Sequence, residues 1–193
     1  KIIKIIHENC LTVNWEKSLF GACELTFLGF DLCAQGIRPN EEKIRAIKMI
    51  KSPKTKKQLL SVLGLCNFYR DFVPNFSRMA VKLFELTEDK VTFSWTEVHE
   101  TALRNLIDEL AKRTLLSHPD PSKPFHIFAD ASDLAVGAAI EQDGKPVSFY
   151  SKKLTSAQVN YSTTEKELLA IILALEHHRS FLWGADITIF SDH

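Results

Sequence analysis

The chain has 193 residues, of which 45% are apolar and 10% aromatic, so it can bury a core in one or two domains. No apolar run approaches the length of a membrane span, and Lys1–Lys4 lack a signal-peptide pattern, which argues against an inserted or secreted protein. Because the chain starts at Lys1 rather than at Met, we expect it to be part of a longer protein.

The net charge of zero conceals segments of different charge. Residues 1–40 carry four basic and four acidic groups, residues 41–86 carry ten and four, and residues 87–193 carry ten and sixteen. A basic segment joined to an acidic one predicts that the first contacts phosphates and the second gathers metal ions.

The first half predicts a short hairpin followed by three helices. Residues 25–30 and 31–34 are expected to be extended, with a turn at Gln35-Gly36. Apolar residues at helical spacing then predict a helix from Asn40 that ends at Ser52-Pro53. A second helix begins at the capping sequence 55–58 and runs toward Tyr69, and a third spans about 76–86, giving a compact basic bundle.

Lysines cluster around the break between the first two helices. One interpretation is a solvated helix surface, and the other is a phosphate-contacting ridge that makes binding sensitive to salt. The lysines concerned are Lys48, Lys51, Lys54, Lys56 and Lys57.

The second half predicts a fourth helix, a proline-rich linker and a new domain. The helix spans about 97–112 and is capped by Ser94 or Thr96, and prolines 119, 121 and 124 mark the linker. The new domain alternates strands and one helix, and the helix crosses over so that the last strand lies parallel to the first. The expected strands are 125–130, 135–142, 146–151 and 187–191, and the expected helix is 163–177, with an Asp143-Gly144 hairpin turn.

Two tetrapeptides nearly repeat each other, at 127–130 and 189–192, and each ends a strand with an aspartate. In parallel neighbouring strands, Asp130 and Asp192 would emerge at the same edge of the sheet, where ligands of open α/β sheets bind.

The helix between these strands offers a third carboxylate. At about 100° per residue, Glu167 aligns with Ala170 and Ala174, which let the helix lie close to the sheet. The helix itself, from Leu168 to Leu175, is expected to be wholly buried. Converging carboxylates favour Mg²⁺ or Mn²⁺, and two such ions are a common device for cleaving phosphodiesters. Taken singly, each acid is explained as well by a turn or by the helix dipole.

The order strand-Asp, hairpin, helix-Glu, strand-Asp resembles ribonuclease H, with spacings of 37 and 25 residues between the acids. The segments 128–132, 160–170 and 191–193 resemble more closely the reverse transcriptases of Ty3/gypsy-type retrotransposons with long terminal repeats. The resemblance extends to the first half, where Phe27-Leu28-Gly29 resembles the primer-grip hairpin and residues 36–44 and 63–76 resemble the thumb.

This resemblance implies a mixed α+β, α/β protein in which a small helical thumb precedes an incomplete ribonuclease H-like mixed sheet. The implied divisions are the end of the palm at 1–40, the thumb at 41–90, a connection helix and linker at 91–123, and the ribonuclease H-like domain at 124–193. The implied nucleic-acid contacts are Phe27, Leu28, Gly29, the five lysines above, Tyr69 and Arg70.

The resemblance also implies a chemistry. Asp130, Glu167 and Asp192 would hold two Mg²⁺ or Mn²⁺ ions and cut the RNA strand of an RNA:DNA hybrid. The implied partners are hybrid, template-primer nucleic acid and the rest of a polyprotein, without a membrane, in a cytoplasmic virus-like particle or the nucleus. The polymerase motif Tyr-x-Asp-Asp is absent, and a fourth carboxylate would lie beyond His193, so we expect this chain by itself to hydrolyse hybrid weakly or not at all.

Two alternatives remain. The chain could be a catalytically inactive remnant or a co-opted nucleic-acid-binding module that keeps its basic bundle. A transposase or integrase of the same fold would place its acids in the order Asp, Asp, Glu, whereas here the middle acid is a helical glutamate.

Overall fold

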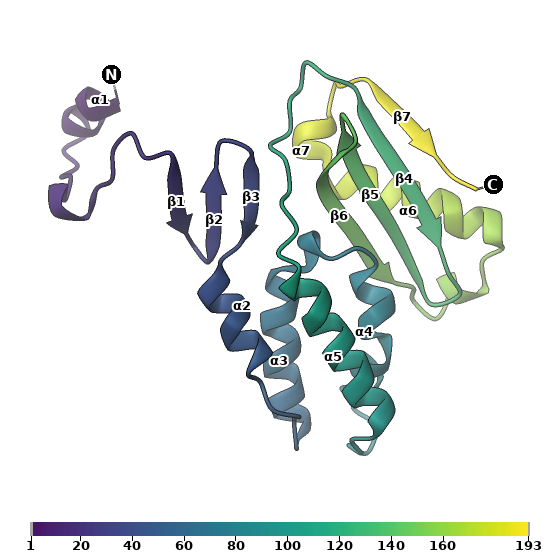
Figure 1. The fold of residues 1–193 in the computed structure, drawn as a ribbon. Coiled ribbons are helices and arrows are strands. Elements are labelled where there is room, and N and C mark those ends of the chain that lie inside the picture. Colours follow the sequence, from purple (N-terminus) through teal and green to yellow (C-terminus); the bar gives the residue numbers. More distant parts are fainter. Residues whose placement is uncertain (1, 193) are drawn as a thin grey trace.

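Residues 2–192, which the computed structural model describes, form a three-stranded sheet, a helical bundle and a four-stranded sheet in that order (Figure 1). Within them, no helix combines the length and apolar character that a membrane span requires. The first part contains α1 (Ile2–Glu8), η1 (Trp15–Lys17), β1 (Glu24–Phe27), β2 (Phe30–Cys33) and β3 (Gly36–Pro39). The bundle contains α2 (Glu41–Lys48), α3 (Lys56–Phe68), η2 (Arg70–Phe72), α4 (Phe76–Glu85) and α5 (Glu97–Ala111). The last part contains β4 (Phe125–Ala131), β5 (Ala135–Gln142), β6 (Lys145–Lys153), η3 (Gln158–Asn160), α6 (Thr163–His177), α7 (Arg179–Leu182) and β7 (Ile187–Phe190).

The first sheet differs from the predicted hairpin. Its three strands are antiparallel in the order β1-β2-β3. Leu28 and Gly29 have φ angles of 49° and 87°, so they form a tight turn between β1 and β2. The prediction of one extended stretch over 25–30 is therefore wrong at these two residues, because left-handed angles at both central positions close a two-residue hairpin.

The helices of the bundle begin where local capping chemistry starts them. The side chain of Asn40 accepts a hydrogen bond from the Lys43 N–H, and that of Thr55 accepts one from the Gln58 N–H. The predicted helix bounds are close to the observed ones, except that α2 ends at Lys48, four residues before Ser52-Pro53.

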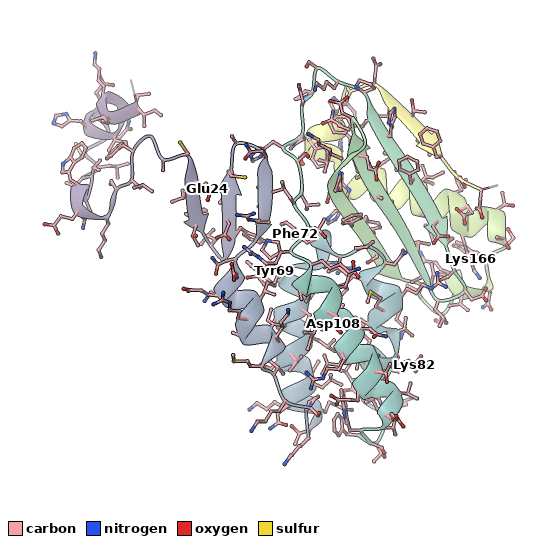
Figure 2. The ribbon with its side chains drawn as sticks, viewed as in Figure 1. Glu24, Tyr69, Phe72, Lys82, Asp108 and Lys166 are labelled. Atoms are coloured by element: carbon pink, nitrogen blue, oxygen red, sulfur yellow. The ribbon has the colours of Figure 1, made fainter. Side chains whose placement is uncertain are left out.

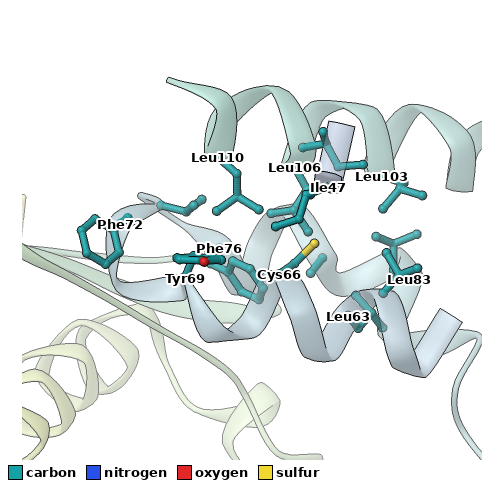
Figure 3. Close-up of a cluster of buried hydrophobic side chains, with 14 of the residues drawn as sticks. Ile47, Leu63, Cys66, Tyr69, Phe72, Phe76, Leu83, Leu103, Leu106 and Leu110 are labelled. Carbon is teal, nitrogen blue, oxygen red and sulfur yellow. The ribbon is translucent and has the colours of Figure 1, made fainter. Parts of the chain in front are cut away.

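All four α-helices of the bundle share one hydrophobic core (Figure 3). Phe76 of α4 and Leu103 and Leu106 of α5 are completely buried in it. Each such side chain contributes roughly 1.5–3 kcal/mol by leaving water. The helix α5 is therefore an integral part of the bundle rather than a separate connecting element.

The second sheet has the order β6-β5-β4-β7, with β7 parallel to β4 and the other pairs antiparallel. This confirms the predicted crossover, and φ angles of 52° and 69° at Asp143 and Gly144 confirm the predicted hairpin turn. The small residues Ala170 and Ala174 are fully buried and let α6 approach the sheet.

Within residues 2–192, α6 is not buried all round, although its apolar pattern predicts cover on both sides. Leu168 is 55% exposed and Ile172 is 44% exposed. The helix therefore packs on the sheet with one side only, and its other side carries apolar residues that nothing in residues 2–192 covers.

Candidate active site and nucleic-acid interface

The two repeated tetrapeptides lie side by side in exact register. Ile127 pairs with Ile189 and Phe128 with Phe190 in the parallel ladder of β4 and β7. Asp130 lies two residues after Phe128, and Asp192 lies two residues after Phe190. The backbone therefore brings both aspartates to the C-terminal ends of neighbouring strands. We call the positions of Asp130, Glu167 and Asp192 the acidic edge.

Glu167 of α6 links the two strand ends. Its Oε1 accepts a hydrogen bond from the Ala131 N–H at 2.9 Å, and its Oε2 accepts one from the Ser191 hydroxyl at 3.2 Å. The residue is 4% exposed. A buried carboxylate is thus held between the residue that follows Asp130 and the one that precedes Asp192.

The two faces of this sheet differ. Phe125, Ile127 and Ala129 of β4 are buried, the first two in a core that includes Ala174 of α6. On the other face, the rings of Phe128 and Phe190 stack with centroids 4.8 Å apart and remain exposed. Strand alternation puts Asp130 on the face of Phe128, so Asp130 and Glu167 approach the edge from opposite faces.

A basic group lies beside the acidic edge. Figure 2 shows Lys166 at the start of α6, near the end of β4. Its Nζ lies 3.3 Å from Oδ1 of Asp133, and the residue is 7% exposed. This ion pair fastens the turn that follows Asp130 to the helix that carries Glu167.

Within residues 2–192, no group of three or more His, Cys, Asp or Glu side chains is arranged so that it could hold a metal ion. Asp130 and Asp192 are exposed, and neither makes a side-chain hydrogen bond within that range. The fold therefore brings the three acidic positions to one edge without closing their side chains into a cluster.

The predicted lysine ridge lies on the surface of the bundle. Four of the five lysines are exposed, namely Lys48, Lys51, Lys54 and Lys57. The fifth, Lys56, is partly buried and donates from Nζ to the Glu88 carbonyl at 2.6 Å.

The predicted hairpin contacts border an apolar groove. Phe27 and Leu28 are exposed at the β1–β2 turn. The groove has a volume of about 810 Å³, with Leu28 and Gly29 on one side and residues of α2 and α3 on the other. Lys43 is the charged residue that lines it.

Tyr69 and Arg70 have roles other than the predicted contact with nucleic acid. Tyr69 is 4% exposed, and its hydroxyl donates to the Gly29 carbonyl at 3.1 Å. Burial raises the pKa of this hydroxyl, and the nearby Asp31 carboxylate adds to the effect. Tyr69 therefore joins the hairpin to the bundle, as its place between them in Figure 2 suggests.

The guanidinium of Arg70 joins the bundle to the second sheet. It donates to the Asn67 side chain at 3.0 Å, to the Ser77 hydroxyl at 3.3 Å and to the Ser151 carbonyl of β6. These bonds place Arg70 at the junction of the two modules, and its contact with nucleic acid stays a prediction.

Sequence reasoning overlooked three residues near the acidic edge. Ser191 precedes Asp192, and successive strand residues point to opposite faces of the sheet. Strand parity alone could therefore have predicted that Ser191 faces α6. Lys166 adjoins Glu167 in the sequence, but no local pattern shows that it is buried. Asn75 lies in another module but lines the same small hollow as Asp130, and no local pattern indicated this proximity.

The chain is similar to one protein family and to polyproteins of transposons. Residues 95–189 match the family described as "RNase H-like domain found in reverse transcriptase". The retrovirus-related Pol polyprotein from transposon opus of Drosophila melanogaster is 35% identical over 199 residues, which cover 95% of this chain and 20% of that protein. The transposon Tf2-3 polyprotein of Schizosaccharomyces pombe is 36% identical over 190 residues, which cover 95% of this chain and 14% of that protein. The chain thus spans a fifth or less of these relatives.

Solved structures show the same architecture. A foamy viral protease-reverse transcriptase dRH in complex with double-stranded DNA matches all of this chain and 35% of its own, with a TM-score of 0.84 and 31% identity. A foamy viral protease-reverse transcriptase in complex with RNA/DNA hybrid matches 92% of this chain and 25% of its own, with a TM-score of 0.80 and 31% identity. The likeness therefore includes the bundle and both sheets.

Proposed function

Because residues 95–189 match the family of RNase H-like domains found in reverse transcriptase, we propose that the acidic edge hydrolyses the RNA strand of an RNA:DNA hybrid. The observation that carries this proposal is the register of β4 and β7, together with the Glu167 carboxylate held between Ala131 and Ser191.

The donor set fits a hard divalent cation. Asp130, Glu167 and Asp192 offer only carboxylate oxygens, which Mg²⁺ and Mn²⁺ prefer. Each Glu167 oxygen accepts one hydrogen bond and keeps a lone pair for another ligand. Two such ions, when bound, supply an activated water and neutralise the charge that develops on the phosphate.

The residues of the chain would prepare this site in separate ways. Glu167 is fixed by its two hydrogen bonds, so it offers a preoriented carboxylate. Asp130 and Asp192 are exposed and would have to turn toward Glu167 to share a cation with it. Lys166 forms an ion pair with Asp133 in the turn behind Asp130.

The bundle would grip the duplex that the acidic edge cleaves. Exposed lysines at the α2–α3 connection offer ammonium groups to phosphates, and contacts of this kind supply affinity without sequence preference. Both foamy viral relatives named above were solved with a nucleic-acid duplex, which supports this part of the proposal.

We expect residues 1–193 to cleave a fluorescently labelled RNA:DNA hybrid slowly in the presence of Mg²⁺, and expect Asp130→Asn to remove this cleavage. The amide is similar in size to the carboxylate but neutral, so it weakens the hold on a cation. Cleavage is measured with protein in excess over hybrid, and the hybrid without protein is the control. Cleavage that Asp130→Asn leaves unchanged would contradict the proposal.

Replacing Lys48, Lys51, Lys54 and Lys57 together with Gln should weaken hybrid binding most at low salt. Each phosphate contact contributes about 0.9 to the slope of log K against log salt concentration, so the slope should fall by about 3–4. Fluorescence anisotropy over a salt series measures it. The exposed lysines Lys17 and Lys145, changed to Gln, serve as controls outside the ridge.

The second candidate function is a nucleic-acid-binding module without catalysis. The lack of a closed carboxylate cluster in residues 2–192 favours it. Salt-dependent binding of hybrid with no Mg²⁺-dependent cleavage would select it over the hydrolytic site.

A further inference from the structure

We propose that Asn75, which the bundle delivers to the acidic edge, is a specificity-determining residue that recognises the RNA strand there. This inference rests on the hydrolytic function proposed above and adds to it a contact from a second module.

A small hollow joins the two modules next to Asp130. It has a volume of about 100 Å³, with Pro74 and Asn75 on the bundle side and Phe128, Asp130 and Gly137 on the sheet side. The acidic edge is therefore bordered by residues that lie more than 50 positions earlier in the chain.

The approach of Asn75 to Asp130 is close. Gly137 is the direct cross-strand partner of Asp130, and β-carbons at such positions lie about 5 Å apart. A β-carbon built on Gly137 would lie only 2.6 Å from Oδ1 of Asn75. The absence of a side chain at Gly137 is what allows the Asn75 amide to lie beside Asp130.

The side chain of Asn75 is not used by its own helix. Its φ and ψ angles are 54° and 31°, a left-handed conformation that Asn adopts more readily than most residues with a β-carbon. It also occupies the N-cap of α4, yet within the described chain its side chain makes no capping hydrogen bond. The amide is thus available for another partner.

Buried hydrogen bonds hold the segment around Asn75 against the sheet. The Ser77 N–H donates to the Ser151 hydroxyl at 2.9 Å, and Arg70 donates to the Ser151 carbonyl. Both serines are 4% exposed. The amide is therefore presented from a fixed backbone.

The chemistry of the amide complements that of the acids. An ionised carboxylate only accepts hydrogen bonds, whereas an Asn amide both donates and accepts. The ribose 2′-hydroxyl also does both, and it distinguishes RNA from DNA. Asn75 consequently adds a group suited to the ribose next to the bond that is cleaved.

The test compares the Kd of residues 1–193 for an RNA:DNA hybrid and for a DNA duplex of the same sequence, in Ca²⁺ to limit cleavage. We expect the wild-type chain to prefer the hybrid and Asn75→Ala to reduce this preference about three- to tenfold, the usual range for one hydrogen bond. The Kd for the DNA duplex should stay unchanged.

Asn75→Gly separates recognition from folding. Gly adopts the left-handed conformation without strain, so the chain should still fold with little change in melting temperature while the preference for hybrid falls. Asp143→Gly is the control at another left-handed position, because Asp143 has a φ of 52° in the β5–β6 hairpin turn. It removes the ion pair between Lys123 and Asp143 but should leave the preference unchanged.

A hybrid preference that survives both Asn75 variants would overturn this inference and leave the hydrolytic site standing. An equal loss of affinity for both duplexes would also overturn it, because it indicates a phosphate contact. Tighter binding by Asn75→Ala would overturn it as well, because it would show that the Asn75 side chain obstructs the duplex instead of contacting it. A different result would contradict the proposed function, namely cleavage that Asp130→Asn does not change.

Discussion

Glu167→Ala is expected to lower the free energy of unfolding by about 1–3 kcal/mol and to abolish Mg²⁺-dependent cleavage of hybrid. The carboxylate accepts the Ala131 N–H at 2.9 Å and the Ser191 hydroxyl at 3.2 Å in a site that is almost closed to water. Truncation leaves both donors without this partner and removes one of the three proposed cation ligands. Urea unfolding and the hybrid-cleavage assay measure the two effects.

Glu167→Gln distinguishes the two roles. The Gln oxygen can still accept the Ala131 N–H, so the free energy of unfolding should stay within about 0.5 kcal/mol of the wild-type value. Cleavage should nevertheless fall about a hundredfold or more, because changes outside the direct ligand set already cost 10- to 100-fold. A Gln variant that cleaves at the wild-type rate would contradict a ligand role for Glu167.

Gly36→Ala is expected to destabilise the chain by about 3 kcal/mol or more, which places it among the severe single substitutions. A β-carbon at Gly36 would lie 2.0 Å from the carbonyl oxygen of Leu116. That oxygen accepts the Ile37 N–H at 2.8 Å, and the Leu116 N–H returns a bond of 2.8 Å to Ile37. The variant must therefore break the bridge that fastens β3 to the segment after α5.

Gly144→Ala is the control for this second prediction. Gly144 has a φ of 69°, but nothing lies within 4 Å of a β-carbon built there. Its substitution should cost only the left-handed strain of about 1–2 kcal/mol. Chemical denaturation of both variants measures the difference, and equal losses would show that the approach of Leu116 to Gly36 contributes nothing.

The elements of the second half follow from local patterns. Strand alternation, the Asp143-Gly144 turn and the apolar face of α6 each depend on residues a few positions apart, and the predicted bounds of β5 and α6 match the observed ones. The repeat at 127–130 and 189–192 also predicted the parallel pairing of β4 and β7, which the structure confirms.

Other features depend on contacts across the chain. The sequence did not reveal that Tyr69 is buried against Gly29 or that Arg70 is bonded to Ser151, because these pairs lie 40 and 81 residues apart. An aromatic and a basic residue at the end of a helix suit a nucleic-acid surface equally well. Only packing decides between the two.

The sequence by itself determined that three carboxylates reach one edge of a sheet, because strand parity and helical periodicity are properties of neighbouring residues. The tertiary structure alone decided what surrounds that edge. It placed Asn75 over Gly137, left one side of α6 exposed and kept Asp130 and Asp192 apart from a closed cluster. These outcomes depend on how modules pack against each other, and no local pattern encodes that packing.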